Sequence, residues 1–294
     1  MPTARAQTVL ITGASSGIGR ATAQQFARRG ARLVLVARGR TSLEETAGEV
    51  RAAGAADVLV CPADVTDEAA VRAVVETAVG RFGDLDVVVH SAAVMAYGRI
   101  EDVPREAFDT VVRTGVMGTA NVARAVLPVF RRQGRGHLVV VSSLLASVSA
   151  PQMGSYVAAK WGQHGLVRTL QQETRDAPGI HVSMVAPGGV NTPIYSQAGT
   201  WAGRSGRPPV PYSSERVARA VVARLDRPRR LVQAGLFNPL IIAGFRLLPS
   251  VYDALVGPLL RAVALEEEEM PPGAGNVFES RPEGNAVDGK WRGL

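Results

Sequence analysis

The segment TVLITGASSGIGR, residues 8–20, is the most informative part of the sequence. Its first five residues form a β-branched and aliphatic run that is typical of a buried strand, and three glycines follow at 13, 17 and 19. Glycines let the backbone turn sharply and approach a pyrophosphate, while the helix that follows offers its N–H groups and positive dipole end. A glycine-rich turn between a first strand and a first helix therefore predicts a dinucleotide-binding site.

Short apolar runs alternate with helical patterns through the first 190 residues or so. Most runs are near-continuous rather than alternating, as expected for strands that are covered on both faces. The order predicts an α/β fold, a doubly wound parallel (Rossmann-like) sheet in three αβα layers, with ligands at the carboxyl ends of the strands. The expected strands are 8–12, 31–37, 57–61, 85–90, 137–142, 180–186 and, at the edge, 229–235; the expected helices are 18–29, 43–53, 67–82, 104–112, 118–133, 156–176 and 214–225.

The composition indicates an intracellular globular protein of 294 residues. Its one cysteine, Cys61, excludes an internal disulfide framework, and the amino-terminal residues have no secretory signal pattern, so we expect a cytoplasmic protein. We expect no metal site. Most of the net charge of +7 lies between Arg204 and Arg230, without zinc-finger spacing or aromatic–basic interleaving. This block indicates a solvated face or attraction to an anionic membrane surface, rather than nucleic-acid binding.

A tyrosine and a lysine lie one helical turn apart in SYVAAKWGQHG, residues 155–165. The spacing of four puts Tyr156 and Lys160 on one face of the expected helix. A phenol has an ordinary pKa of about 10, which makes it a slow acid–base group at neutral pH. Because a neighbouring ammonium favours the phenolate, we expect Lys160 to lower the pKa of Tyr156.

These motifs together resemble the short-chain dehydrogenase/reductase family over about residues 6–235. TGASSGIG has the family's glycine spacing, Ser143 lies thirteen residues before Tyr156, and PGGVNT (187–192) is similar to the segment that lies against the nicotinamide. The resemblance implies an oxidoreductase that interconverts a carbonyl and an alcohol by hydride transfer. Tyr156 would be the acid and base, Lys160 would also bind the nicotinamide ribose, and Ser143 would orient the substrate oxygen while Ser142 points away.

The resemblance also implies which residues bind the dinucleotide. They are Thr12, Gly13, Ser15, Ser16, Gly17, Ile18, Gly19, Arg38, Asp64, Val65, Ala92, Tyr156, Lys160, Pro187, Gly188, Val190 and Thr192. Relatives that prefer NAD usually carry an acidic residue at the end of the second strand, whereas this chain has Ala37, Arg38 and Arg40 there. A guanidinium can bind a 2′-phosphate bidentately, so we expect NADP(H) over NAD(H); an arginine that faces water is the alternative.

The chain departs from the family pattern in two places. His90-Ser91-Ala92-Ala93 replaces Asn-Asn-Ala-Gly, and we expect His90 to be a structural hydrogen-bonding residue. Gly115 stands where the family has the asparagine of its catalytic tetrad, and Asn121 is too far along the helix to replace that amide. A dinucleotide-binding sensor or scaffold with little turnover therefore stays an alternative, as does the epimerase or dehydratase branch of the superfamily.

The last residues, 236–294, are expected to extend the catalytic domain 1–235 and not to form a domain of their own. Residues 236–265 are strongly apolar but are broken by three prolines, and the longest uncharged run near the C-terminus, 231–245, is too short to span a membrane. The segment indicates a lid over the substrate, a subunit interface of a homo-oligomer, or peripheral contact with an anionic membrane. The tail after the glutamates 266–269 is rich in glycine and proline and is expected to be an ordered arm at most.

A lid would imply an apolar substrate, with Tyr195, Trp201 and Phe237 lining one cavity. The substrate itself is set by the loops 94–100, 144–153 and 193–212, which vary freely on such a scaffold, so its identity and the reaction direction stay open.

Overall fold

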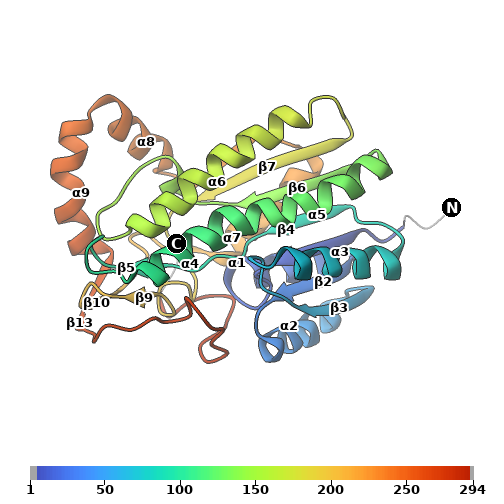
Figure 1. Ribbon diagram of the computed structural model, residues 1–294, viewed down its shortest axis with the longest axis horizontal. Coiled ribbons are helices and arrows are strands. Elements are labelled where there is room, and N and C mark those ends of the chain that lie inside the picture. Colours follow the sequence, from blue (N-terminus) through green and yellow to red (C-terminus); the bar gives the residue numbers. More distant parts are fainter. Residues whose placement is uncertain (1–4, 292–294) are drawn as a thin grey trace.

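Seven parallel strands form the central sheet of the chain, whose residues 5–291 are described by a computed structural model. The strand order is β12-β7-β6-β4-β1-β2-β3, and each neighbouring pair is parallel (Figure 1). The strands are β1 (Thr8–Thr12), β2 (Arg32–Ala37), β3 (Asp57–Pro62), β4 (Val87–His90), β6 (Gly136–Val141), β7 (Ile180–Pro187) and β12 (Leu231–Ala234). The predicted doubly wound sheet and its edge strand near 229–235 are confirmed.

Helices cover both faces of this sheet, as the continuous apolar strands require. The helices are α1 (Gly17–Ala27), α2 (Arg40–Ala52), α3 (Glu68–Phe82), α4 (Arg105–Val112), α5 (Gly118–Gln133), α6 (Gly154–Glu173) and α7 (Ser214–Asp226). A π-helical turn, η1 (Arg113–Met117), joins α4 to α5, and a short 3₁₀ turn, η2 (Leu144–Ala146), follows β6. The seven predicted helices therefore lie where the periodicity placed them, within a few residues at each end.

Successive strand side chains point to opposite faces and build two separate cores. Val9 and Ile11 of β1 pack with α1, α2 and α7, whereas Leu10 packs with α3, α5 and α6. The same alternation holds in β2, where Leu33 and Leu35 lie in the first core and Val34 in the second. Burial on both faces explains why these strands lack a polar face in the sequence.

The strand order reverses between β1 and β4, and the loops after these two strands meet there. A Cβ atom on Gly13 would lie 2.8 Å from the backbone N of Ala92, so only glycine permits this approach. Crevices at such a switch point, outside the carboxyl ends of the strands, are where ligands of open α/β sheets bind.

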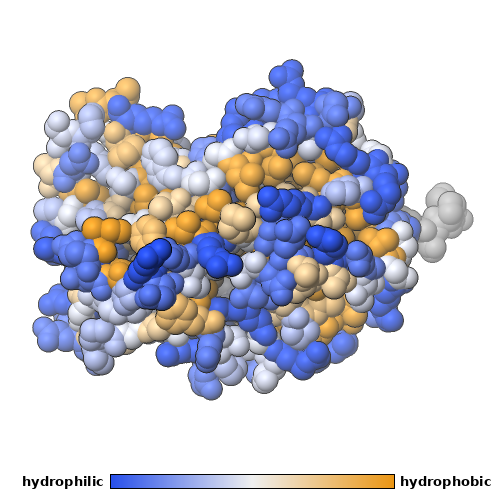
Figure 2. Space-filling view, viewed as in Figure 1, coloured by the Kyte–Doolittle hydropathy of each residue, from blue (hydrophilic) through white to orange (hydrophobic). Residues whose placement is uncertain are grey.

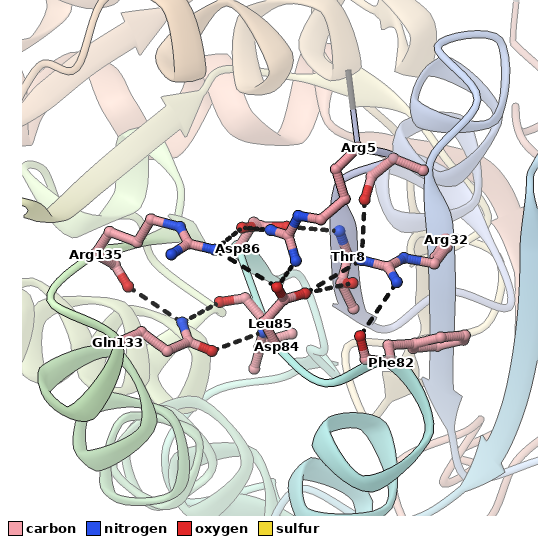
Figure 3. Close-up of polar contacts among 10 residues, drawn as sticks. Arg5, Thr8, Arg32, Phe82, Asp84, Leu85, Asp86, Gln133 and Arg135 are labelled. Atoms are coloured by element: carbon pink, nitrogen blue, oxygen red, sulfur yellow. Dashed lines mark hydrogen bonds and ion pairs between the residues drawn. The ribbon is translucent and has the colours of Figure 1, made fainter. Parts of the chain in front are cut away.

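The opposite, amino-terminal edge of the sheet is held by a charged network (Figure 3). Asp84 and Asp86 precede β4; the Asp84 carboxylate pairs with Arg5 and with Arg32 at 3.2 Å, and Asp86 pairs with Arg5 at 2.7 Å. Arg135, before β6, lies 3.5 Å from Asp84. These pairs tie the starts of neighbouring strands together at the end of the molecule away from the crevice.

The chain continues past β12 into an apolar helical hairpin, α8 (Asn238–Leu247) and α9 (Pro249–Val263), which projects from the sheet (Figure 1). The expected C-terminal helical extension is thus present. Within residues 5–291, no helix is long and apolar enough to cross a membrane. Short strands that the sequence did not predict join the loops around the crevice: β5 (Ala96–Tyr97), β8 (Val190–Asn191), β9 (Gly199–Thr200), β10 (Arg204–Gly206), β11 (Tyr212–Ser213) and β13 (Leu265–Glu269).

Candidate active site

A cavity of about 210 Å³ runs along the carboxyl ends of the strands at the switch point. Every predicted catalytic and dinucleotide-binding residue lines it except Thr12 and Gly19. The phosphate-loop residues and Arg38 lie on one part of its wall, and Ser143, Tyr156 and Lys160 lie on another. Segments that are more than a hundred residues apart in the sequence are thereby brought to one site.

The glycine loop between β1 and α1 is closely packed. Gly13 and Gly17 have φ values of +69° and +55°, in the region that favours glycine. A Cβ on Gly19 would lie 2.1 Å from the carbonyl oxygen of Gly13, so Gly19 serves the contact between helix and loop. A Cβ on Gly17 would approach the Thr192 side chain to 3.3 Å, which puts the loop beside the segment 187–192. The turn is of the kind that binds a pyrophosphate, and in this structure the Gly17 amide at its rim donates to the Ala286 carbonyl of the C-terminal tail at 2.8 Å.

Thr12 and His90 explain why the loop lies so close to β4. The Thr12 hydroxyl and Nδ1 of His90 are 2.8 Å apart, and both side chains are buried. The amides of Ser91 and Ala92 also donate to Thr12 Oγ1, at 3.2 and 3.4 Å. Burial lowers the pKa of His90 to about 3, with the Lys160 ammonium adding to the shift. His90 is thus a neutral hydrogen-bonding residue that joins two strands, in agreement with the expectation from the sequence.

The phenol of Tyr156 differs from the expectation. Burial raises its pKa well above the ordinary value, the nearby Tyr195 adds to the rise, and a hydrogen bond with Ser143 opposes it. Lys160 Nζ lies 5.4 Å from the centre of the Tyr156 ring, but the net shift of the Tyr156 pKa is upward, opposite to the predicted lowering, because burial of the phenol dominates. The phenol is held in its protonated form.

Two serines follow β6, and they differ in their surroundings. Ser143 accepts a hydrogen bond from the Leu145 amide at 3.1 Å and caps η2. Ser142 Oγ is buried and has no hydrogen-bond partner within residues 5–291. Of the two, Ser143 is the serine that hydrogen-bonds the Tyr156 phenol.

Lys160 is buried, and its ammonium has two acceptors: the Val141 carbonyl at 3.4 Å and Gln163 Oε1 at 3.2 Å. Burial lowers the pKa of Lys160 to about 8. The amide nitrogen of Gln163 donates to Thr119 Oγ1 at 2.9 Å and reaches the Gly115 carbonyl at 3.4 Å. A fully buried amide therefore connects the lysine to the turn where the tetrad asparagine is missing.

Gln163 was not among the residues predicted from the motifs, although it lies in the segment SYVAAKWGQHG, residues 155–165. Gln163 lies one helical turn after Lys160 and two after Tyr156, on the face of α6 that was expected to be functional. A glutamine at a core position of a helix must have partners. Asn121, by contrast, donates to the Val65 carbonyl at 3.0 Å and takes no part in this network.

Arg38 lies at the cavity, as expected, but its guanidinium faces the C-terminal tail. Its nitrogens donate to the main-chain carbonyls of four successive tail residues, Asn276, Val277, Phe278 and Glu279, at 2.5–3.4 Å. Arg40 does not line the cavity and pairs with Glu44 at 3.5 Å. The expectation that Arg38 is available to grip a phosphate is thus not met in this structure, because the tail supplies its acceptors.

A lid was one of the three alternatives for the apolar hairpin, and the hairpin does not line this cavity. Tyr195 lines the cavity, but Trp201 packs in a neighbouring core cluster and Phe237 is half exposed at the start of α8. No residue of the segment 236–265 lines the cavity, whereas Asn276, Ser280, Arg281 and Asn285 of the tail do. The part of the extension that closes the site is therefore its glycine- and proline-rich end.

Comparison with known proteins agrees with this geometry. The profile of the short chain dehydrogenase family matches residues 7–203. The chain belongs to this family. An oxidoreductase named BOA17 from Botryotinia fuckeliana is 32% identical over 284 residues, which cover 97% of this chain and 96% of that protein.

Two solved structures of the family have the same fold. An alcohol dehydrogenase from Thermococcus sibiricus, complexed with 5-hydroxy-NADP, is 31% identical and superimposes with a TM-score of 0.68 over 79% of this chain and 96% of its own. A family member from Burkholderia phymatum, in complex with NAD, is 26% identical with a TM-score of 0.73 over 88% and 98%. The chain is thus an oxidoreductase of the family, with a nucleotide-binding Rossmann-like fold.

Proposed function

We propose that the protein is an NADP(H)-dependent oxidoreductase that interconverts a carbonyl and an alcohol on a small, largely apolar substrate. The observation that carries the proposal is the single cavity that joins the glycine loop at one end to Ser143, Tyr156 and Lys160 at the other. The bound nicotinamide dinucleotide would donate or accept the hydride. We also propose that the enzyme is cytoplasmic and works as a homo-oligomer.

The residues of this chain would handle the proton and the substrate oxygen. In the direction of reduction, Tyr156 would donate its phenolic proton to the oxygen, and burial keeps that proton on the phenol. The Ser143 hydroxyl, which bonds the same phenol, would orient the oxygen. Lys160 would bind the nicotinamide ribose and provide a fixed positive charge, held by Val141 and Gln163.

The preference for NADP(H) rests on charge at the adenosine end of the cavity. The second strand ends without a carboxylate, and Asp64 is the one acidic residue among those that line the cavity within residues 5–291. Asp64 accepts from both the amide and the hydroxyl of Thr66 at 2.8 Å, which turns it into a loop-forming residue. Arg38 and Arg281 line the same end, and their positive charges favour a ligand with an additional phosphate.

Binding and turnover can be measured separately. Fluorescence titration should give tighter binding of NADPH than of NADH by wild-type protein. Turnover of NADPH with a panel of apolar ketones and aldehydes should fall by about 10²–10⁴-fold in Tyr156→Phe, the usual contribution of a positioned acid, while NADPH affinity changes little. Binding without turnover by the wild type would favour a sensor or scaffold, and equal turnover by the variant would remove Tyr156 as the acid.

A further inference from the structure

The last described residues of the chain, 275–291, form a strap across the mouth of the cavity. In Figure 1 this red segment leaves β13 and follows the lower edge of the molecule before it turns back toward the middle. Val277 anchors its start: the side chain is fully buried in the cluster that also contains Met95 and Tyr97. The strap has almost no regular structure, so the contacts along its length hold it in place.

Arg38 holds the first part of the strap. All four of its donations go to consecutive main-chain carbonyls, from Asn276 to Glu279. Because the acceptors belong to the main chain, these contacts do not depend on the side chains of the strap. The planar Arg38 guanidinium has several N–H donors and can bond the four carbonyls together, which a lysine ammonium could not. Burial lowers the pKa of Arg38 from its ordinary value, and the nearby Asp64 carboxylate opposes this shift.

Gln197, buried in the loop after β8, holds the middle of the strap. Its Nε2 lies within hydrogen-bond distance of the carbonyls of Arg281 and Glu283 and of Asn285 Oδ1. Asn285 in turn donates to the buried Ser42 hydroxyl at 2.7 Å. The strap is thereby fixed to the start of α2.

The far end of the strap reaches the glycine loop and the segment around α7. The Gly17 amide donates to the Ala286 carbonyl at 2.8 Å. The Ser214 hydroxyl donates to Val287 O at 2.7 Å, and its amide donates to Asp288 at 2.9 Å. Trp291 packs edge-on against Tyr195, with ring centres 5.7 Å apart. The strap therefore contacts the cavity wall at the end of β2, at the glycine loop and at Tyr195.

Residues of the sheet edge and of the strap line the same open space, so the strap forms one wall of the cavity. At the adenosine end, a Cβ on Gly39 would lie 2.9 Å from Ser280 Oγ, so the strap passes directly over the turn after β2. Arg281 follows and lines the cavity, and its guanidinium makes no hydrogen bond or ion pair within residues 5–291. Of the two cavity arginines at this end, Arg281 is the one without protein acceptors.

We infer that the C-terminal strap is part of the dinucleotide site, in which Arg38 clasps the strap and Arg281 on the strap binds the 2′-phosphate that distinguishes NADPH from NADH. This inference rests on the proposed function. It reassigns the specificity for the phosphate from the end of β2, where the family pattern places it, to a segment almost 250 residues later in the chain. Arg38 then governs retention of either dinucleotide, whereas Arg281 governs the choice between them.

Two point variants separate these roles. Arg281→Gln should raise the Kd for NADPH by about tenfold or more, the loss of a charge-assisted hydrogen bond, and leave the Kd for NADH within about twofold. Arg38→Gln should raise both Kd values by a similar factor. In the unliganded protein, Arg38→Gln should also speed hydrogen exchange in strap peptides by about tenfold or more, while Arg281→Gln should not. Arg105→Gln, an exposed arginine of α4, is the matched control and should change none of these values.

Deletion of 275–294 should weaken the binding of both dinucleotides and also remove the preference for NADPH. If the shortened chain folds poorly, the two point variants still test the inference. Three results would overturn the inference. The first is an Arg38→Gln variant that binds only NADPH more weakly and whose strap exchanges hydrogen at the wild-type rate, and the second is an Arg281→Gln variant with unaltered NADPH affinity. The third is tighter dinucleotide binding after the deletion, which would show that the strap blocks the site. If the wild-type protein binds NADPH well and the variants bind it equally well, the role of the strap is rejected and the proposed function stands. A wild-type protein that binds neither dinucleotide rejects the proposed function and the inference together.

Discussion

At the scale of single residues, Gly115 and Gln163 compensate for one another. A Cβ on Gly115 would lie 2.8 Å from the Cβ of Ala159 on α6, so the turn η1 packs too closely on that helix for an asparagine. Gln163 supplies an amide from α6 instead, and its oxygen accepts from Lys160 while its nitrogen reaches the Gly115 carbonyl. The chain thus keeps a polar partner for the lysine by taking it from a different helix.

Replacing Gln163 should therefore alter the lysine and not only the packing. Gln163→Leu removes one acceptor of the Lys160 ammonium, which lowers the pKa of Lys160 further below about 8, whereas Gln163→Glu raises it through a carboxylate at the same place. The alkaline limb of the kcat profile should move to lower pH in the first variant and to higher pH in the second. Gln163→Leu should also reduce kcat by about tenfold, the energy of one charge-assisted hydrogen bond.

The matched control lies on the same helix. Gln171 is also buried, but it donates to the carbonyls of Val182 and Arg230, away from the lysine. Gln171→Leu should destabilise the fold to a similar degree and leave the pH profile in place. Equal pH profiles in all four proteins would show that Gln163 only fills space.

His90 makes the fold sensitive to acid. Its pKa is about 3 in the folded protein and about 6.5 in an unfolded chain, so the unfolded state binds a proton first as the pH falls. Stability is therefore present above about pH 6.5 and is lost progressively toward pH 3. Between pH 7 and pH 5 the wild type should lose about 2 kcal/mol through this residue, measured by urea unfolding.

The variant His90→Asn restores the residue that relatives carry and removes the titrating group. Between pH 7 and pH 5 the free energy of unfolding of the variant should fall by about 2 kcal/mol less than that of the wild type, even if the variant is less stable at pH 7. His137, whose pKa burial lowers to about 4, remains in both proteins and accounts for the acid sensitivity that is left. An unchanged difference between pH 7 and pH 5 in the variant would contradict this assignment.

At the scale of elements, the sequence was sufficient for the sheet and insufficient for the loops. The runs TVLIT and LVVV predict strands because they are short and continuously apolar, as expected for strands that are covered on both faces. All seven sheet strands lie where expected. The strands β5 and β8–β11 have two or three residues each and form through pairing with distant segments. Their residues carry no periodicity, since a two-residue strand has none to show.

The candidate site divides in the same way. Residues that lie next to a strand end, such as Ser143 or Gly13, could be placed at the cavity because the position of that end is fixed by the fold. The contacts of Arg38 could not be predicted, because its partners are carbonyls almost 240 residues later in the chain. Every residue has a main-chain carbonyl, so the sequence does not indicate which ones accept. The sign of the pKa shift of Tyr156 was also out of reach, because it depends on how completely neighbouring loops bury the phenol.

At the scale of the whole molecule, the α8–α9 hairpin exposes apolar side chains that the rest of the described chain leaves uncovered. No residue of α9 is buried, and Leu240 and Leu247 of α8 are 72% and 77% exposed. Figure 2 shows orange, hydrophobic atoms at the upper left, where Figure 1 places the hairpin. Exposed apolar side chains that gather on one element mark interaction surfaces of proteins, so the hairpin indicates a binding surface.

We expect a second copy of the chain to cover this surface. Leu255 and Leu259 are one helical turn apart on α9 and are both exposed by about 60%, so they form the stripe that an isologous contact would bury. In sedimentation velocity, wild-type protein should run as a dimer or larger species, and Leu255→Glu/Leu259→Glu should run as a monomer with NADPH affinity retained. Ile100→Glu, which places the same charge on an exposed apolar residue outside the hairpin, should leave the assembly unchanged. A wild type that is monomeric at every concentration and sediments with anionic vesicles would instead assign the hairpin to a membrane surface, where the same two glutamates should abolish binding.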